Sequence, residues 1–237
     1  LKRGLSFKGI VGIFGHRQVG KTTLLELLSR RYVTLDHSLE NNRANSEPEF
    51  FLDEKARNSR DWPIAIDECQ LAPPLFPALK DYVRTHKAPG IFLLSGSVRF
   101  SSRKAIRESL TGRILTYELL PFSISELQGK PKNSLARDLL GADLRRFSFK
   151  GNAQGLAKNR EAQKYLKLGG LPGILFVRNE RDRNELFESQ LGLILDRDLR
   201  LGCETSLPLS RLRILAQILA ENQNRPVNLS ELARRAR

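Results

Sequence analysis

The segment Gly15–Thr23 reads GHRQVGKTT and fits the pattern Gly-x4-Gly-Lys-Ser/Thr. The apolar run GIVGIF ends directly before it, and leucines at helical spacing follow it. Glycines at positions 15 and 20 allow backbone conformations that turn amide hydrogens inward, and the positive end of a following helix points at the same place. Lys21 adds a cation, and the Thr22 hydroxyl adds a ligand for a divalent metal ion. This segment therefore predicts a site for a phosphate chain with Mg²⁺.

We expect the whole segment to contact a bound nucleoside triphosphate. The expected binding residues are Gly15, His16, Arg17, Gln18, Val19, Gly20, Lys21, Thr22 and Thr23. Lys21 is also predicted to act in catalysis, because it should reach the β- and γ-phosphates, while Thr22 should coordinate the metal.

A second chemical element is PIAIDECQ, an apolar strand pattern that ends in two acids, Asp67 and Glu68. Asp67 is predicted to hold Mg²⁺ through water, and Glu68 to polarise the water that attacks the γ-phosphate. Acids of this kind also occur as simple helix-start residues. Carboxyl ends of parallel strands border the crevice where ligands bind, which favours the catalytic interpretation.

Two further candidates lie downstream. The next strand pattern ends in Ser95, Gly96 and Ser97, and the small hydroxyls of Ser95 and Ser97 could touch the γ-phosphate or the attacking water. A turn that uses Ser and Gly for backbone reasons explains the same residues. Arg113 follows Gly112 before a strand and could present its guanidinium to a phosphate in the same subunit or in a neighbouring one. An ordinary solvated or ion-paired arginine is the alternative.

The elements that position these residues follow from hydrophobic patterning. Short apolar runs alternate with helix-like segments, which predicts an α/β fold with a doubly wound parallel sheet of the P-loop type. The expected strands are Gly9–Phe14, Tyr32–Leu35, Pro63–Ile66, Gly90–Ser95 and Ile114–Leu119. The expected helices are Lys21–Arg31, Leu75–Thr85, Glu161–Leu168, Glu180–Leu201, Ser210–Asn222 and Leu229–Ala236. A polar segment at Gly129–Gly141 divides the chain into a predicted nucleotide-binding domain, residues 1–130, and a mainly helical region, residues 131–237.

Composition excludes several classes. With 40% hydrophobic and 28% charged residues, the chain of 237 residues is typical of a globular protein and not of a disordered one. Its longest apolar stretches, such as Leu191–Leu195, are far shorter than the roughly 20 residues that cross a bilayer, so no membrane contact is expected. Cys69 and Cys203 suggest neither a metal site nor a disulfide framework, and we expect reduced thiols in a cytoplasmic protein.

The formal net charge is +14, which favours an anionic partner such as nucleic acid, or an acidic protein surface. The basic residues are spread along the chain, and solvated helix faces would show the same pattern.

The segments GHRQVGKTTLL, YVTLD, IDECQ, LSGS, SLTGRI and LLPFSISEL occur in this order. Together they resemble prokaryotic AAA-type ATPases of the AAA+ superfamily that carry a poorly characterised C-terminal domain. The resemblance covers about residues 8–128, and the later GGLPG and RDLRLG segments are similar to that family's C-terminal part.

The resemblance implies an AAA-like core that binds ATP with Mg²⁺. In that core Gly15–Thr22 would be the Walker A element, Asp67 and Glu68 the Walker B acids, and Ser95–Ser97 the sensor region. Arg113 matches the family's Gly-Arg pair, and a finger-like role for it is a hypothesis. The closing VNLSELARRAR resembles the opening helix of a winged-helix-like unit, and many AAA-type proteins form rings, so a homo-oligomer is one expectation.

These observations leave three functional hypotheses. The sequence contains no Asn-Lys-x-Asp segment of the kind that selects guanine, so ATP is the expected nucleotide. The first hypothesis is Mg²⁺-dependent ATP hydrolysis that drives a conformational switch. The second is an ATP-gated nucleic-acid-binding or regulatory module with little turnover. The third, a small-molecule or nucleotide kinase, requires an acceptor pocket and usually a mobile lid, and no lid signature is visible.

Overall fold

The strands of the first half are short and apolar because both faces of the sheet are covered by helices. In the computed structural model the strands are β1 (Ile10–Gly15), β2 (Arg31–Thr34), β3 (Ile64–Asp67), β4 (Phe92–Ser97) and β5 (Ile114–Leu119). They form one parallel sheet with the order β2-β3-β4-β1-β5. The predicted strands are confirmed, each within two residues of its expected bounds.

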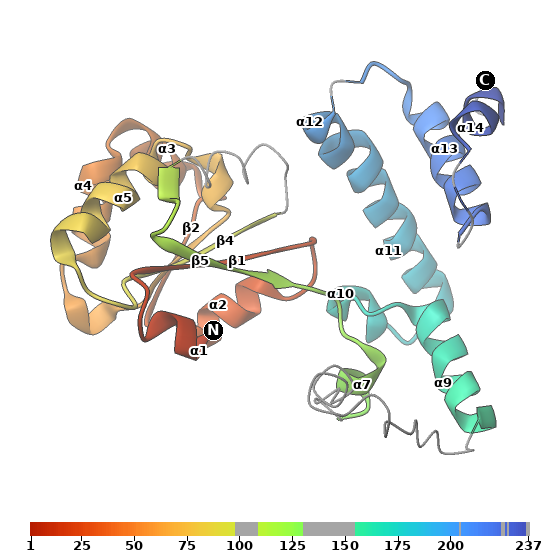
Figure 1. Cartoon of the computed structure of the whole chain (residues 1–237), viewed down its shortest axis with the longest axis horizontal. Helices are drawn as coiled ribbons and strands as arrows, with labels where there is room; N and C mark the ends of the chain where they lie inside the picture. Colours follow the sequence, from red (N-terminus) through yellow and green to blue (C-terminus); the bar gives the residue numbers. More distant parts are fainter. Residues whose placement is uncertain (98–108, 130–154, 204, 224–225, 227, 236–237) are drawn as a thin grey trace, which may run out of the picture.

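The structure describes residues 1–97, 109–129, 155–203, 205–223, 226 and 228–235 (Figure 1). The predicted boundary between residues 130 and 131, and most of the polar segment that suggested it, lie outside these ranges.

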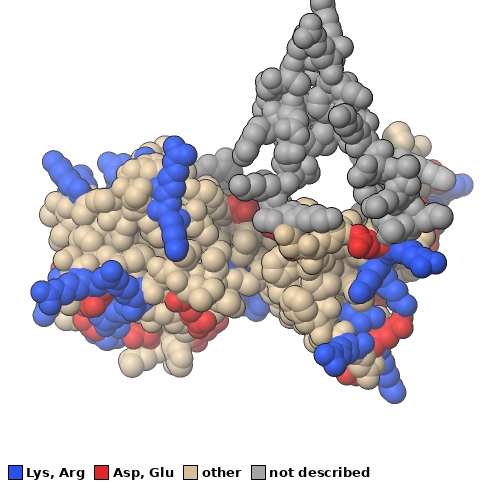
Figure 2. All heavy atoms as spheres, turned by 90° about the horizontal axis from the view of Figure 1, so that it is seen from below, with Lys and Arg blue, Asp and Glu red and all other residues tan. Residues whose placement is uncertain are grey.

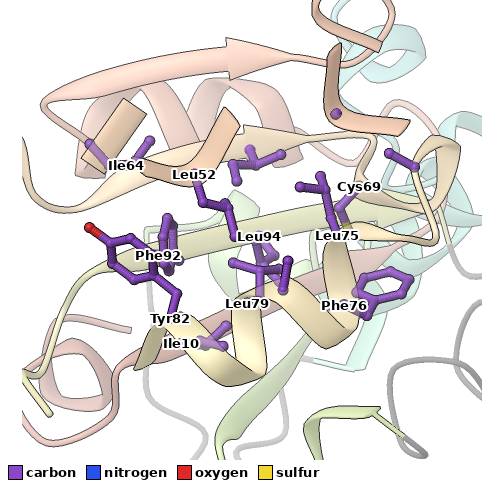
Figure 3. Close-up of a cluster of buried hydrophobic side chains, with 14 of the residues drawn as sticks. Ile10, Leu52, Ile64, Cys69, Leu75, Phe76, Leu79, Tyr82, Phe92 and Leu94 are labelled. Atoms are coloured by element: carbon purple, nitrogen blue, oxygen red, sulfur yellow. The ribbon is translucent and has the colours of Figure 1, made fainter. Parts of the chain in front are cut away.

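Helices cover both faces of the sheet, as a doubly wound fold requires. They are α1 (Lys2–Leu5), α2 (Lys21–Leu28), α3 (Ser38–Ser46), α4 (Pro48–Ala56) and α5 (Leu75–His86), with the short turns η1 (Ser59–Asp61) and η2 (Cys69–Leu71). Side chains alternate along each strand, so one strand contributes to two cores. Ile64 belongs to the larger core together with Phe76 and Leu79 of α5 (Figure 3). Ile66 belongs to the same core. Ala65, between them, faces the smaller core with Leu25 of α2.

In the part of the second half that the structure describes, the regular elements are helices. After β5 come α7 (Ile124–Leu127), α9 (Gly155–Leu168), α10 (Pro172–Leu175), α11 (Glu180–Leu193), the π-helical turn η3 (Ile194–Asp198), α12 (Leu199–Gly202), α13 (Leu209–Glu221) and α14 (Leu229–Arg235). Elements α11, η3 and α12 follow one another without a break, which confirms the long helix expected at Glu180–Leu201. The π turn within it was not predicted.

The carboxyl ends of the strands face this helical half (Figure 1). Ligands of open α/β sheets bind at the carboxyl edge, so the fold places the candidate residues between the two halves. Among the described helices none combines the length and the apolar character that a membrane span requires.

Candidate functional site

The loop Gly15–Thr22 connects β1 to α2, and its lysine is buried. Lys21 is the first residue of α2 and is only 7% exposed. Its Nζ donates to the carbonyl oxygens of Gly15 at 3.1 Å and His16 at 2.9 Å. Burial lowers the pKa of Lys21, while the nearby carboxylates of Glu68 and Asp67 favour its charged form. The loop thus folds around its own cation, whose hydrogen bonds go to two backbone carbonyls of the loop itself.

The backbone geometry explains why glycine stands at both glycine positions of the pattern, 15 and 20. Gly20 has φ 94°, in the left-handed region that favours glycine. A Cβ on Gly15 would lie 2.3 Å from the carbonyl oxygen of Leu119 on β5, so the neighbouring backbone occupies the space of a side chain. Gln18 has φ 62° without being glycine, a local strain that is frequent in functional loops.

Asp67, the last residue of β3, is 2% exposed and accepts four hydrogen bonds. Its Oδ2 accepts from the hydroxyl of Thr22 at 2.7 Å and from the phenol of Tyr32 at 2.9 Å. Its Oδ1 accepts from the backbone N–H of Glu68 at 2.9 Å and from the hydroxyl of Ser95. A buried carboxylate requires such partners, and here they fix its position between two strands and the loop.

Tyr32 remains a donor to Asp67 over the whole neutral range. Burial, together with the Asp67 charge, raises the pKa of Tyr32 to about 12. The phenol therefore keeps its proton near pH 7 and can donate to Oδ2.

Glu68 lies differently from its neighbour. It is half-buried and adopts φ 54° and ψ 40°, again in the left-handed region. Its Oε2 accepts a hydrogen bond from the side-chain amide of Gln70. One acid of the pair is thus fixed inside the protein, and the other lies at the boundary between protein and solvent.

The residues around Thr22 fit a hard divalent cation. No group of three or more His, Cys, Asp or Glu that could hold a metal occurs in the described ranges. Mg²⁺ is usually bound by one or two protein ligands, with phosphates and water completing its shell. The hydroxyl of Thr22 and the carboxylate of Asp67, 2.7 Å apart, could supply that protein share.

Two residues of the loop touch the helical half directly. The Nδ1 atom of His16 lies 3.3 Å from Nε2 of Gln190 on α11, and Gln190 is 4% exposed. Gly173 of α10 lies against Gln18, because a Cβ on Gly173 would be 3.3 Å from the Cβ of Gln18. The loop is therefore part of the contact between the two halves.

The third contact is an ion pair. Nε of Arg17 lies 3.8 Å from Oδ2 of Asp198, the last residue of the π turn η3. The same carboxylate favours the charged form of Lys21, so its field reaches the centre of the loop. Single π turns within α-helices are frequent at functional sites.

Comparison with known proteins shows the family of this chain. The protein-family model described as AAA domain matches residues 8–128. The chain belongs to the AAA domain family. The chain is also 27% identical over 238 residues to the uncharacterised proteins Mb2031c of Mycobacterium bovis and Rv2008c of Mycobacterium tuberculosis. Those alignments cover 99% of this chain but only 46% of each relative, so the chain spans less than half of their length.

Two solved structures illustrate similarity at low identity. The FIGL-1 AAA domain in complex with ADP gives a TM-score of 0.37 at 15% identity, with 97% of this chain and 79% of that chain covered. PCH-2 of C. elegans gives a TM-score of 0.34 at 13% identity, with 96% and 59% covered.

Within the AAA domain the structure brings most of the predicted residues together. Lys21, Thr22, Asp67 and Glu68 meet at one edge of the sheet. Val19 is buried, and Thr23 is exposed on α2. Ser97 ends β4 beside Gly15, but its side chain is outside what the structure describes.

The structure does not bring Arg113 to this edge. Arg113 precedes β5, and the first residue of β5 pairs with Ile10, the first residue of β1. The loop lies at the other end of β1, about 20 Å away at the usual rise per residue. Arg113 instead borders a surface hollow with Phe7, Lys8 and Lys87. A role in a neighbouring copy stays a prediction.

Sequence reasoning missed three contacts to the acid pair. Ser95 lies one pleat before the predicted Ser97, and Tyr32 lies in a strand to which no chemistry was assigned. Gln70 closes the IDECQ segment and was not given a role. A polar residue within an apolar strand pattern was the available signal for Ser95 and Tyr32.

Proposed function

We propose that this AAA domain binds ATP with Mg²⁺ and hydrolyses it, and that the helical half responds to the bound nucleotide. The observation that carries the proposal is the hydrogen bond from Thr22 to Asp67 beside the buried Lys21. It combines a phosphate-binding cation, a hydroxyl ligand and a carboxylate at the carboxyl edge of the sheet, where ligands of this fold class bind.

In the proposed reaction Lys21 exchanges its carbonyl contacts for β- and γ-phosphate oxygens, with which it forms much stronger bonds. Thr22 and Asp67 would hold Mg²⁺. The ion, when bound, neutralises phosphate charge. Glu68 orients a water molecule and accepts its proton as the water oxygen bonds to the γ-phosphorus and the bond to the ADP oxygen breaks.

The contacts of the loop with α10, α11 and η3 support the coupled switch. Nε of Arg17 and Oε1 of Gln190 are buried, and neither forms a hydrogen bond with the described residues. Buried polar groups rarely lack a hydrogen bond, which favours an interface that rearranges when the phosphates of a nucleotide bind to the loop. The two halves would then move relative to each other as the nucleotide changes.

The basic charge gives weaker support to a nucleic-acid-binding function. Figure 2 shows Lys and Arg over both halves, in several places next to acidic residues. Several basic side chains of the helical half are ion-paired: Lys167 with Glu180, Arg200 with Asp196, Arg213 with Glu188 and Arg235 with Glu221. Part of the positive charge is therefore neutralised by acidic side chains of the same chain.

The test is Mg²⁺-dependent phosphate release from ATP by the wild type, Lys21→Ala and Glu68→Gln, with ATP binding measured on each. Lys21→Ala should lose ATP binding. Glu68→Gln should bind ATP, but its turnover should fall by about 100-fold or more. Lys2→Ala, which removes an exposed lysine on α1, is the charge-matched control. Tight ATP binding without turnover in the wild type would instead support the gated binding module.

A further inference from the structure

Glu68 occupies a backbone conformation that its residue type does not favour. Non-glycine residues with φ near 54° are uncommon, and they persist where the surrounding structure holds them. Two hydrogen bonds restrain the Glu68 backbone. Its carbonyl accepts from the backbone N–H of Leu71 at 2.9 Å, and its own N–H donates to the side chain of Asp67. The turn after β3 therefore sets the direction in which the Glu68 side chain leaves the backbone.

Gln70 then contacts the end of that side chain. It lies in the η2 turn, between the buried Cys69 and Leu71, and its Nε2 donates to Oε2 of Glu68. The bond joins two half-buried side chains only two residues apart, so both of its partners come from the turn after β3.

The neighbouring strand leaves room for this amide. A Cβ on Gly96 of β4 would lie 2.3 Å from Oε1 of Gln70, a separation that real side chains do not show. Gly96 pairs with Phe14, one residue before the loop, so β4 is fixed there by the sheet. A larger residue at position 96 would displace Gln70 from its place beside Glu68.

From these three features we infer that Gln70 is a positioning residue, which holds Glu68 where it can activate water. The inference rests on the proposed hydrolysis. A neutral amide suits this role, because it donates to one carboxylate oxygen without neutralising the charge. The other oxygen, Oε1, can then accept the water proton while the new bond to the γ-phosphorus forms and the bond to ADP breaks.

The test compares the wild type with Gln70→Met, which keeps the length of the side chain and removes the amide. Turnover should fall about tenfold or more, the factor expected when a hydrogen bond to a charged group is lost. The dissociation constant of a non-hydrolysable ATP analogue should stay within about twofold, because the hydrogen bonds of Lys21 and Thr22 go to Gly15, His16 and Asp67.

Two variants separate positioning from a general loss of structure. Gly96→Ala should reduce turnover as Gln70→Met does, and the double variant should be no slower than the worse single one, because both act through one contact. Gln217→Met is the matched control, since Gln217 also donates to a glutamate, Glu221, but on α13. It should turn over like the wild type.

The outcomes distinguish the two proposals. A wild type that releases no phosphate removes both the hydrolysis and this inference. An active wild type with unchanged turnover in Gln70→Met overturns the inference alone. The inference is also overturned if Gln70→Met loses affinity for the ATP analogue in proportion to its loss of turnover. Gln70 would then support the fold of the whole site.

Discussion

Thr22 and Asp67, 45 residues apart in the chain, are joined by a 2.7 Å hydrogen bond from the threonine hydroxyl to Oδ2 of the aspartate. The bond links the first turn of α2 to the end of β3. It keeps the proposed metal ligands together before any ion binds, so binding does not have to order them.

Asp67→Asn should remove the Mg²⁺ dependence of ATP binding and reduce stability. The carboxylate accepts on both oxygens, whereas an amide has one acceptor, so its NH₂ group would face donors. We expect the free energy of unfolding to fall by about 1–3 kcal/mol, measured by urea titration.

Thr22→Val should also lose the Mg²⁺ dependence of ATP binding, while Thr22→Ser keeps the hydroxyl and should retain it. Equal Mg²⁺ dependence in Thr22→Val and Thr22→Ser would argue against the proposed ligand.

Tyr32→Phe should destabilise the protein by about 1 kcal/mol near pH 8, because one hydrogen bond to a buried carboxylate is lost. The pKa of Tyr32 is raised from 10.0 to about 12, so the folded state favours the neutral phenol. That contribution is fully present below pH 10 and is lost as the pH rises through about 12. Urea unfolding between pH 8 and about 11.5 should show the gap between wild type and variant closing. A gap that stays constant with pH would contradict the assigned contact.

Much of the fold could be predicted from local pattern, and the parts that could not depend on long-range contacts. The strands could be predicted because they are apolar runs, as expected for a sheet that helices cover on both faces. Helix α3 was not localised, since its sequence SLENNRANS is polar and only Ala44 is buried. Its asparagines bond to distant backbone instead, for example Asn45 to the carbonyl of Leu71 at 3.1 Å.

The same division holds for the candidate site. Lys21, Thr22 and Asp67 were identified because contiguous motifs contain them. The contact of Tyr32 with Asp67 depends on β2 lying next to β3, which no local pattern specifies. The contact of His16 with Gln190 joins residues 174 positions apart, and it follows only from how the halves pack.

Gly15→Ala should destabilise the protein through a backbone clash. The new Cβ would lie 2.3 Å from the carbonyl oxygen of Leu119, and the sheet fixes both strands. We expect a loss of about 1–3 kcal/mol in the free energy of unfolding, the usual range for overpacking. The control is Gly192→Ala on α11, where a Cβ would meet only Arg213 Nη2 at an ordinary 3.6 Å. It should be neutral or stabilise the protein by up to about 1 kcal/mol, because alanine favours helix.

Asp198→Asn should tighten ATP binding. The Asp198 carboxylate lies 3.8 Å from Arg17 and acts on Lys21, so it competes with the phosphates for both cations. The pair is about a quarter exposed, which limits the gain to about 1 kcal/mol, or about fivefold in the dissociation constant. Titration with a fluorescent ATP analogue at about 0.05 M and 0.5 M salt should show a larger gain at low salt, because salt screens the repulsion.

Asp196→Asn is the matched control for this variant. Asp196 lies in the same π turn but pairs with Arg200, at 3.1 Å, and not with the loop. Its affinity for ATP should equal that of the wild type. Weaker ATP binding in Asp198→Asn alone would mean that the carboxylate holds Arg17 in place for the phosphates. In that case the helical half would assist nucleotide binding, whereas a gain would show that the nucleotide must displace it.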